Sequence, residues 1–429
     1  MIQTVLYPDR SQWSSLMQRA ISNTAELHDS VASIINEVRT RGDEALRDFA
    51  SRFDGVELKN LKVSADEIAE ADDIVAHPLK QAIAIAAKNI SAFHKAQRME
   101  EISLDTMPGV TCCQRAVPIS KVGLYIPGGN SPLFSTVLML AIPARIAGCR
   151  KIVLCTPPNK EGKVHPAILY TARIAGVTEI YKVGGAQAVA AMAYGTESVP
   201  KVHKIFGPGN RFVMEAKQQV GAQAVAIDMP AGPSEVMIIA DENANPRFVA
   251  SDFLSQAEHG PDSQSILLTT SEDFAQKLPS VIEELLSTLP RQEMMKKSLS
   301  HSRIIVLRND DEIMAFSNEY APEHLIINHA EADALAQKVE NAGSVFLGAY
   351  SPESAGDYAS GTNHTLPTSG FAKCYNGVNI DSYMRKITFQ RLSKEGLQAL
   401  GGTIEIMAEN EDLIAHKQAV TWRLNHINE

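Results

Sequence analysis

A glutamine and a histidine three residues apart, in the segment SQAEHGPDS, are residue types that can bind a metal ion. Asn245 and Pro246 predict the start of a helix, and Gly260–Pro261 predicts its end. Gln256 and His259 would then share one face of the last helical turn. The same residues fit a helix end at which the dipole favours His259 and water solvates Gln256. The spacing alone favours this second interpretation, because glutamine is an uncommon zinc ligand.

A second segment, APEHLIIN, places Glu323 beside His324 at the entrance of a predicted strand. A carboxylate and an imidazole can divide the roles of acid and base in a reaction. Neighbouring residues of a regular strand point to opposite faces of the sheet. An ordinary polar loop is therefore the better interpretation unless the segment is irregular.

The segment YSPESAGDYASGTNHTLPTSG is rich in glycine, serine, threonine and proline, and connections of this length are usually functional or disordered. It holds two possible metal ligands, Asp357 and His364, which are equally credible by their chemistry. Three glycine-rich turns, YIPGGNSP, VGGAQA and FGPGN, could bring backbone N–H groups to a phosphate. None of them completes GxGxxG, so ordinary tight turns explain them as well.

The five cysteines have irregular spacing and form no CxxC pair, which indicates neither a disulfide framework nor a thiolate zinc site. A reducing, cytoplasmic setting is the simplest interpretation. Cys149 and Cys155 flank a predicted buried strand and fit buried small hydrophobes better than nucleophiles. A serine nucleophile of the GxSxG type is absent from the sequence.

The composition places the chain among globular proteins, with 45% hydrophobic and 21% charged residues among 429. The formal net charge of −10 argues against nucleic-acid binding, which needs a basic surface. The N-terminus lacks the pattern of a signal peptide, and no apolar run is long enough to span a membrane.

Strands alternate with helices through short loops from about residue 120 onward, which predicts parallel sheets covered by helices. We expect an α/β protein with two Rossmann-like parallel-sheet units, an N-terminal helical segment and a C-terminal helical tail. Residues 1–22 would form an N-terminal arm. Residues 23–120 would pack with residues 236–375 as the first α/β domain, and residues 121–235 would form the second. The polar tail, 376–429, would dock on a partner subunit.

Taken together, the motifs from about residue 115 to the end resemble those of the L-histidinol dehydrogenase family. They include VGLYIPGGNSPLFSTVLMLAIPARIAGC, KVGGAQAVAA, KIFGPGN, AIDMPAGPSEV, SQAEHGPDSQ, APEHL, AGDYASGTNHTLPT and EDLIAHKQAV, in the family's order. The resemblance implies a zinc- and NAD-dependent enzyme of histidine biosynthesis. It would oxidise L-histidinol to L-histidinaldehyde and then to L-histidine, with one hydride passing to NAD in each step.

The resemblance also implies a homodimer with shared sites, in which zinc binds Gln256, His259, Asp357 and a partner subunit's His416. Zinc would hold the imidazole and amino nitrogens of the substrate, and the hydride would go to the nicotinamide because zinc has no redox chemistry. His364 would then belong to loop structure, and Glu258 to the helix surface.

The resemblance assigns acid/base chemistry to the Glu323–His324 pair. His324 would accept the hydroxyl proton, and Glu323 would activate the water that adds at the aldehyde stage. Further residues would contact the substrate or NAD. The substrate set is Ser234, Gln256, His259, His324, Asp357, Glu411 and His416, and the NAD set is Tyr125, Gln187 and Asn210.

Two other classes of function use part of the same pattern. A zinc hydrolase could use the same ligands with Glu323 polarising a metal-bound water, but it would not need the turns that carry Tyr125, Gln187 and Asn210. A non-enzymatic binding protein with two α/β lobes would fit the fold, although the common periplasmic kind needs a secretion signal.

Overall fold

The computed structural model describes three stretches of the chain, residues 2–19, 25–128 and 131–427. Two sequence predictions lie outside the described residues: the boundary between residues 22 and 23, and Gly129 and Asn130 of the first glycine-rich turn. Within the described stretches, none of the helices is long and apolar enough to cross a membrane.

The chain divides into two compact units. The first consists of residues 1–97 and 120–383, and the second of residues 98–119 and 384–429. The first unit holds two parallel sheets, which confirms the predicted α/β class.

The larger sheet has six parallel strands in the order β1-β11-β10-β9-β12-β13. The expected N-terminal arm supplies the edge strand β1, so it is part of this sheet. The strands are β1 (Gln3–Leu6), β9 (Glu235–Ala240), β10 (Gln264–Thr269), β11 (Arg303–Val306), β12 (His324–Asn328) and β13 (Ser344–Leu347).

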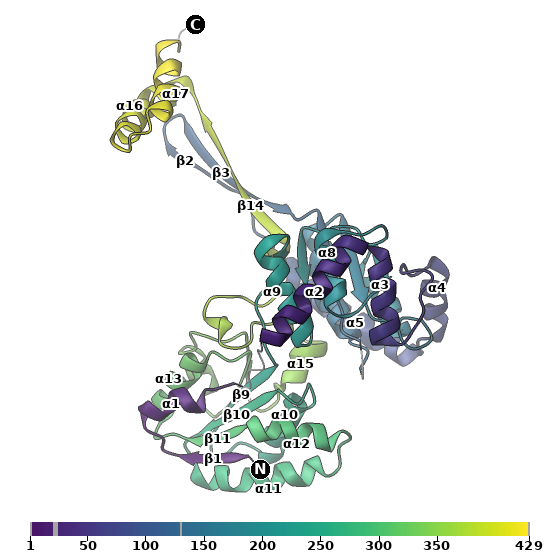
Figure 1. Cartoon of the computed structure of the whole chain (residues 1–429). Coiled ribbons are helices and arrows are strands. Elements are labelled where there is room, and N and C mark those ends of the chain that lie inside the picture. Colours follow the sequence, from purple (N-terminus) through teal and green to yellow (C-terminus); the bar gives the residue numbers. More distant parts are fainter. Residues whose placement is uncertain (1, 20–24, 129–130, 428–429) are drawn as a thin grey trace. The chain divides into compact units, whose positions relative to one another are not determined.

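Alternate residues of β9 enter two different cores, so both faces of this sheet are buried. Val236 and Ile238 pack in one core, and Met237 and Ile239 pack in the other. This explains why the strand is a continuous apolar run. One face is covered by α10 (Pro246–Ala257), α11 (Glu272–Leu286) and α12 (Gln292–His301), and the other by α1 (Arg10–Leu16), α13 (Asp310–Tyr320) and α14 (Ala332–Ala336) (Figure 1).

The smaller sheet has five parallel strands in the order β6-β5-β4-β7-β8. The chain builds outward from β4 to β6 and then returns to place β7 on the other side of β4. The elements are β4 (Lys121–Tyr125), α6 (Phe134–Ala147), β5 (Lys151–Thr156), α7 (Pro166–Ala175), β6 (Glu179–Lys182), α8 (Gly185–Tyr194), β7 (Lys204–Phe206), α9 (Arg211–Gln223) and β8 (Ala226–Ile227).

The helices between residues 25 and 49 share a core with the smaller sheet, although the sequence predicts that they pack with residues 236–375. Val31, Leu46 and Phe49 share one core with Val189 and Ile205 of the smaller sheet's layers, whereas Asn89 of α5 (His77–Ala96) donates a hydrogen bond to the Ala359 carbonyl oxygen, within residues 236–375. The apolar stripes of these helices show that one face of each helix must be buried. They do not show which part of the protein covers that face. The elements are α2 (Ala25–Arg41), α3 (Asp43–Phe49), a π-helical turn (Ala50–Asp54), α4 (Ala65–Ile74) and α5 (His77–Ala96).

The second unit is a three-stranded antiparallel sheet followed by two helices (Figure 1). Its strands correct the expectation that residues 98–120 and the C-terminal tail are wholly helical. Because most of these strand residues are exposed, they lack the alternation that marks a half-buried strand. The elements are β2 (Ile102–Met107), β3 (Val110–Pro118), β14 (Met384–Leu392), α16 (Lys394–Asn410) and α17 (Ile414–Asn425).

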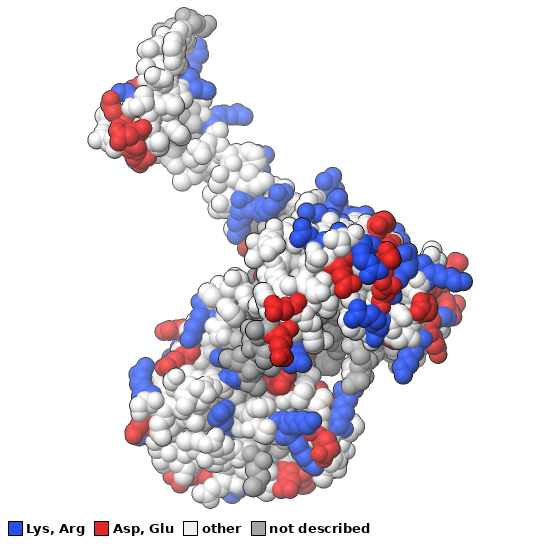
Figure 2. Space-filling model, in the orientation of Figure 1, with Lys and Arg blue, Asp and Glu red and all other residues white. Residues whose placement is uncertain are grey.

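Basic and acidic side chains are interspersed over the surface of the first unit in the face shown in Figure 2. This distribution fits the formal net charge of −10. A stripe of basic residues, which is typical of nucleic-acid-binding proteins, does not stand out among the described residues on that face.

Candidate active site

Several candidate residues gather at the amino-terminal edge of the six-stranded sheet. Ser234 immediately precedes β9, and His324 is the first residue of β12, the neighbouring strand. Helix α10 follows β9 and returns along the sheet, so its last turn lies at the same edge. Open parallel sheets usually gather ligands at their carboxyl edge, and this cluster therefore departs from the common pattern.

The side chains of Glu323 and His324 lie close together, although neighbouring side chains of a regular strand point to opposite faces of the sheet. The Nδ1 atom of His324 is 3.6 Å from Oε2 of Glu323. Glu323 precedes the first residue of β12, and Ala321 has a φ of 55°, so regular strand alternation does not apply there. The objection raised by the sequence pattern is thereby removed.

The Glu323 carboxylate is buried and held by two donors. Its Oε2 atom accepts hydrogen bonds from the Ser234 hydroxyl at 2.8 Å and from the Glu235 N–H at 3.0 Å. Burial raises the pKa of Glu323 to about 7, against the opposing effect of His324. A carboxylate with a pKa near neutrality is suited to act as a general base.

His324 is almost completely buried, and its two ring nitrogens have different surroundings. Nδ1 lies 3.3 Å from the Glu235 carbonyl oxygen, whereas Nε2 has no hydrogen-bond partner in the described part of the chain. A carbonyl oxygen can only accept, so Nδ1 carries a proton toward it, and Nε2, which lies 3.6 Å from Asp357 Oδ1, is the ring nitrogen that can gain or lose a proton. Burial lowers the pKa of His324, but Glu353, Glu323 and Asp357 together raise it well above its usual value.

Gln256 and His259 lie where the sequence predicts the end of a helix. Asn245 caps α10 as expected, with its side chain accepting from the Arg247 N–H at 2.9 Å. The helix ends at Ala257, so His259 follows the helix and does not lie in its last turn, which corrects the prediction.

The Gln256 side chain fits a metal ligand. It is fully buried, and neither Oε1 nor Nε2 has a hydrogen-bond partner within the described residues. Buried amides are normally hydrogen-bonded, so an unpaired one needs an explanation such as a bound ion. The interpretation of Gln256 as a solvated residue is therefore wrong.

Helix α15 (Glu353–Tyr358) supplies two carboxylates to the same place. His259 Nε2 is 4.0 Å from Asp357 Oδ2 and 4.0 Å from Glu353 Oε1. Ligand atoms of these three residues lie within 4.8 Å of one another. Nitrogen and carboxylate oxygen donors are those that zinc accepts, so these residues together with Gln256 fit a zinc site.

Glu353 was not identified from the sequence. It is buried, and both carboxylate oxygens lack hydrogen-bond partners among the described residues, although Oε1 lies 3.5 Å from His324 Nδ1. Burial raises the pKa of Glu353 to about 8. Its position four residues before Asp357 places both side chains on one helix face, a spacing that could have revealed it.

His364 uses both ring nitrogens within the protein. Nδ1 lies 2.8 Å from the Asp357 carbonyl oxygen, and Nε2 lies 3.1 Å from the Thr136 hydroxyl. These contacts fix the backbone of Asp357 and leave no ring nitrogen of His364 for a metal.

The predicted NAD residues lie at the carboxyl edge of the five-stranded sheet or beside it. Tyr125 ends β4, and Asn210 follows β7, the strand beside it. The strand order reverses between β4 and β7, which is where open α/β sheets form a nucleotide crevice. The Tyr125 hydroxyl accepts from the Gly185 N–H at 3.1 Å, the Asn210 side chain caps α9, and Gln187 is buried in α8.

His416 and Glu411 belong to the second unit. Glu411 is the C-cap of α16, His416 lies in the first turn of α17, and both are exposed. The structure thus brings His259 and Asp357 together with the Glu323–His324 pair inside the first unit, with Gln256 in the last turn of α10 just before His259. Glu411 and His416 belong to the other unit.

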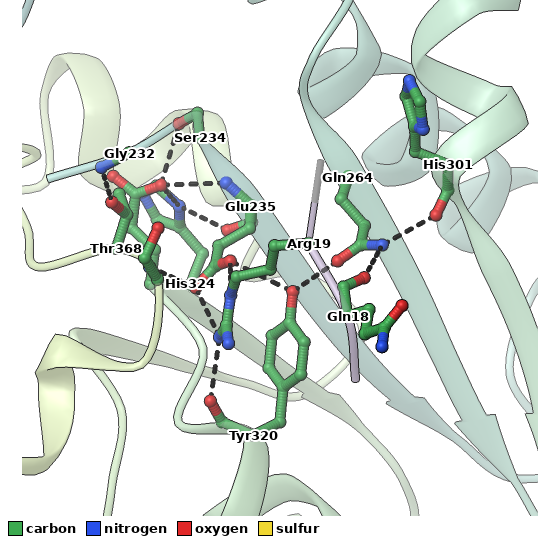
Figure 3. Close-up of polar contacts among 12 residues, drawn as sticks. Gln18, Arg19, Gly232, Ser234, Glu235, Gln264, His301, Tyr320, His324 and Thr368 are labelled. Carbon is green, nitrogen blue, oxygen red and sulfur yellow. Dashed lines mark hydrogen bonds and ion pairs between the residues drawn. The ribbon is translucent and has the colours of Figure 1, made fainter. Parts of the chain in front are cut away.

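A buried polar network borders the Glu323–His324 pair and was missed by the sequence analysis (Figure 3). The Glu235 carboxylate accepts two hydrogen bonds from Arg19, at 2.5 and 3.0 Å. The Tyr320 hydroxyl lies 3.0 Å from Glu235 and 2.8 Å from Gln264. Arg19 and Glu235 are 216 residues apart, so no local spacing could reveal their contact.

Comparison with known proteins gives consistent matches along the chain. The sequence profile of the histidinol dehydrogenase family matches residues 17–424. Histidinol dehydrogenase of Bacteroides fragilis (strain YCH46) is 58% identical over 426 residues, covering 99% of this chain and 100% of the relative. The Escherichia coli (strain K12) histidinol dehydrogenase is 53% identical, covering 96% and 95%. The crystal structure of the enzyme from Elizabethkingia anophelis matches with a TM-score of 0.97 at 51% identity, covering 100% and 99%.

Proposed function

The chain belongs to the histidinol dehydrogenase family, and we propose that it oxidises L-histidinol to L-histidine in two NAD-dependent steps within histidine biosynthesis. In the first step the alcohol and NAD give L-histidinaldehyde, NADH and a proton. In the second step the aldehyde, water and a second NAD give the carboxylic acid, NADH and a proton. Because the family consists of oxidoreductases, the hydrolase and binding-protein alternatives lose their support.

The observation that carries this proposal is the arrangement of the Glu323–His324 pair. In its neutral form, His324 takes the hydroxyl proton of the substrate on Nε2, the ring nitrogen that has no hydrogen-bond partner in the described chain and lies 3.6 Å from Asp357 Oδ1. Glu323 takes a proton from the water that adds to the aldehyde. Its pKa of about 7 allows it to be ionised at neutral pH and to remain a useful base.

No cysteine is needed for the second oxidation. Cys155 is fully buried and burial raises its pKa, while burial raises the pKa of Cys149 to about 12. Neither thiol would form the thiolate that a covalent route requires. Water activated by Glu323 supplies the second oxygen atom of the product instead.

Gln256, His259 and Asp357 would hold zinc, and the partner subunit's His416 would complete the set. When bound, zinc would act as a Lewis acid that holds and orients the imidazole and amino nitrogens of the substrate. Ser234 and the partner subunit's Glu411 would make further substrate contacts.

Tyr125, Gln187 and Asn210 would line the NAD site. The reversal of strand order between β4 and β7 supports this assignment, since backbone turns at that edge approach a dinucleotide closely. Gly207, in the turn after β7, has a φ of 132°, and a side chain there would collide with the Tyr125 carbonyl. The Tyr125 hydroxyl and the Asn210 side chain would thus act by holding the two turns in place.

A homodimer with shared sites fits the second unit. Helices α16 and α17 carry exposed apolar residues, including Ile406, Met407 and Trp422, which are suited to an interface between subunits. The same helices carry His416 and Glu411, so an interface built there would bring residues of one subunit to the site of the other.

The test combines purified protein, zinc, NAD and L-histidinol, and measures NADH and L-histidine together. We expect two NADH molecules for each L-histidine formed. Absence of NADH, accompanied by hydrolysis of an ester or amide of histidine, would contradict the proposal. Glu293→Gln, which replaces an exposed carboxylate, serves as the active control beside Glu323→Gln.

A further inference from the structure

We infer that Arg19 and Glu235 form a positioning pair that sets the geometry of Glu323 and His324, so that the N-terminal segment is a working part of the active site (Figure 3). This inference rests on the proposed function, because it concerns the same acid/base residues. Arg19 and Glu235 act through these residues and not by touching the substrate.

The backbone of Glu235 contacts both members of the acid/base pair. Its N–H donates to Oε2 of Glu323 at 3.0 Å, and its carbonyl oxygen lies 3.3 Å from Nδ1 of His324. The first contact orients the carboxylate, and the second holds the Nδ1 proton toward the carbonyl oxygen, so that Nε2 is the nitrogen that exchanges a proton with the substrate. A small shift of this one peptide would therefore disturb both groups.

The Glu235 side chain anchors that peptide. Arg19 binds both carboxylate oxygens, with Nε to Oε2 at 2.5 Å and Nη2 to Oε1 at 3.0 Å. The Ser369 N–H donates to Oε1 at 3.2 Å, and the Tyr320 hydroxyl donates to Oε2 at 3.0 Å. Burial raises the pKa of Tyr320 well above its usual value, so its phenol stays protonated and remains a donor.

Arg19 also contacts the segment of the chain that precedes Glu323. Its Nη2 atom donates to the Tyr320 carbonyl at 2.8 Å, and its guanidinium lies 3.8 Å from the centre of the Tyr320 ring. Only Ala321 and Pro322 separate Tyr320 from Glu323, and Ala321 is held in the left-handed region. One side chain thus fixes the ends of both segments, β9 and α13, that meet at Glu323.

Charge and burial make Arg19 hard to replace. The side chains of Arg19 and Glu235 are 17% and 2% exposed, so loss of Arg19 leaves a buried carboxylate without its cation. A lysine would keep the charge but cannot bind both oxygens and stack on the ring in one arrangement, as the planar guanidinium does. The pair therefore supplies geometry as well as charge.

The kinetic test compares Arg19→Lys and Arg19→Gln with two controls in the zinc-loaded, full-length enzyme. Arg247→Gln removes an exposed arginine that also binds both oxygens of a carboxylate, that of Glu284. Trp13→Phe weakens the packing of α1, the helix that precedes Arg19, without touching the network. We expect kcat to fall about 10-fold to 100-fold in Arg19→Gln and less in Arg19→Lys, with the KM for L-histidinol changed by less than about 3-fold.

A structural role alone predicts a different result. If Arg19 only stabilised the fold, then Arg19→Lys and Trp13→Phe variants with matched melting temperatures would retain the wild-type kcat for each folded molecule. That outcome would overturn the inference. A rise in KM with an unchanged kcat would also overturn it, because it would place Arg19 in substrate binding.

A second readout does not depend on turnover. Diethyl pyrocarbonate modifies accessible imidazoles, and peptide mass spectrometry reports the rate at His324, which is 2% exposed in the wild type. We expect His324 to be modified several-fold faster in Arg19→Gln and Arg19→Lys, and at the wild-type rate in Arg247→Gln. Equal rates in all variants would refute the positioning pair. If the wild type produced no NADH, the proposed function would fail, while these rates would still decide the role of Arg19.

Discussion

Replacing Gln256 with methionine tests whether its buried amide is built to hold a metal ion. Methionine keeps the unbranched shape of the side chain and removes both polar atoms. Oε1 and Nε2 are buried without partners in the described structure, and each such group costs about 1–3 kcal/mol. Loss of one heavy atom opposes this gain by about 1 kcal/mol. We therefore expect metal-free Gln256→Met to be more stable than the metal-free wild type, by about 1–5 kcal/mol.

Zinc should reverse that order. A ligand that binds only the folded state adds about 4 kcal/mol of stability at one thousand times its dissociation constant, and the variant loses much of this gain. Denaturant unfolding with a chelator and with excess zinc measures both differences. Gln264→Met is the matched control, because this buried glutamine bonds to Tyr320 and to the His301 carbonyl and its loss should destabilise both forms. A metal-free Gln256→Met protein that is less stable than the wild type would refute the reasoning.

Three further predictions concern the reaction. Glu323→Gln should slow oxidation of L-histidinaldehyde by about 10²–10⁴-fold and affect oxidation of L-histidinol less, because only the aldehyde step needs an activated water. Separate single-turnover assays on the two substrates measure the two losses, and an equal loss in both would contradict this prediction. Since burial raises the pKa of Glu323 to about 7, the aldehyde step of the wild type should fall as pH drops through about 7, and a pH–rate profile that is flat from pH 6 to 8 would contradict this. Mixing the His416→Asn chain with the Glu323→Gln chain should restore activity in hybrid dimers, because one of the two sites of each hybrid is then intact. Hybrids that stay inactive would argue against shared sites.

The alternation of strands and helices predicts the α/β class because apolar runs bounded by turns identify buried parallel strands without knowledge of their neighbours. The same pattern cannot choose a partner for α2 and α3, whose apolar faces fit any complementary surface. Strand β14 escaped prediction because Phe389 and Leu392 are partly exposed and no clean alternation marks the strand.

The site could be predicted where its residues lie close together in the chain. Glu323 and His324 are adjacent, and Gln256 and His259 share a helix end, so local sequence shows them as candidates. Arg19 and Glu235 meet only after the sheet has formed, and nothing near either residue signals the other. Glu353 is an intermediate case. Its spacing of four residues from Asp357 can be seen in the sequence, but its burial cannot.

The three-stranded sheet of the second unit joins segments that the ribosome makes at very different times. Met384 pairs with Pro118, and Leu392 pairs with Val110. The last partner of β3 therefore emerges roughly 270 residues after β3 itself, which takes roughly 14–54 s at about 5–20 residues per second. A two-stranded hairpin is at best marginally stable alone, and its open edge can pair with other chains. The nascent protein thus carries an unfinished sheet edge for most of its synthesis, and the second unit is completed only when the final tenth of the chain has been made.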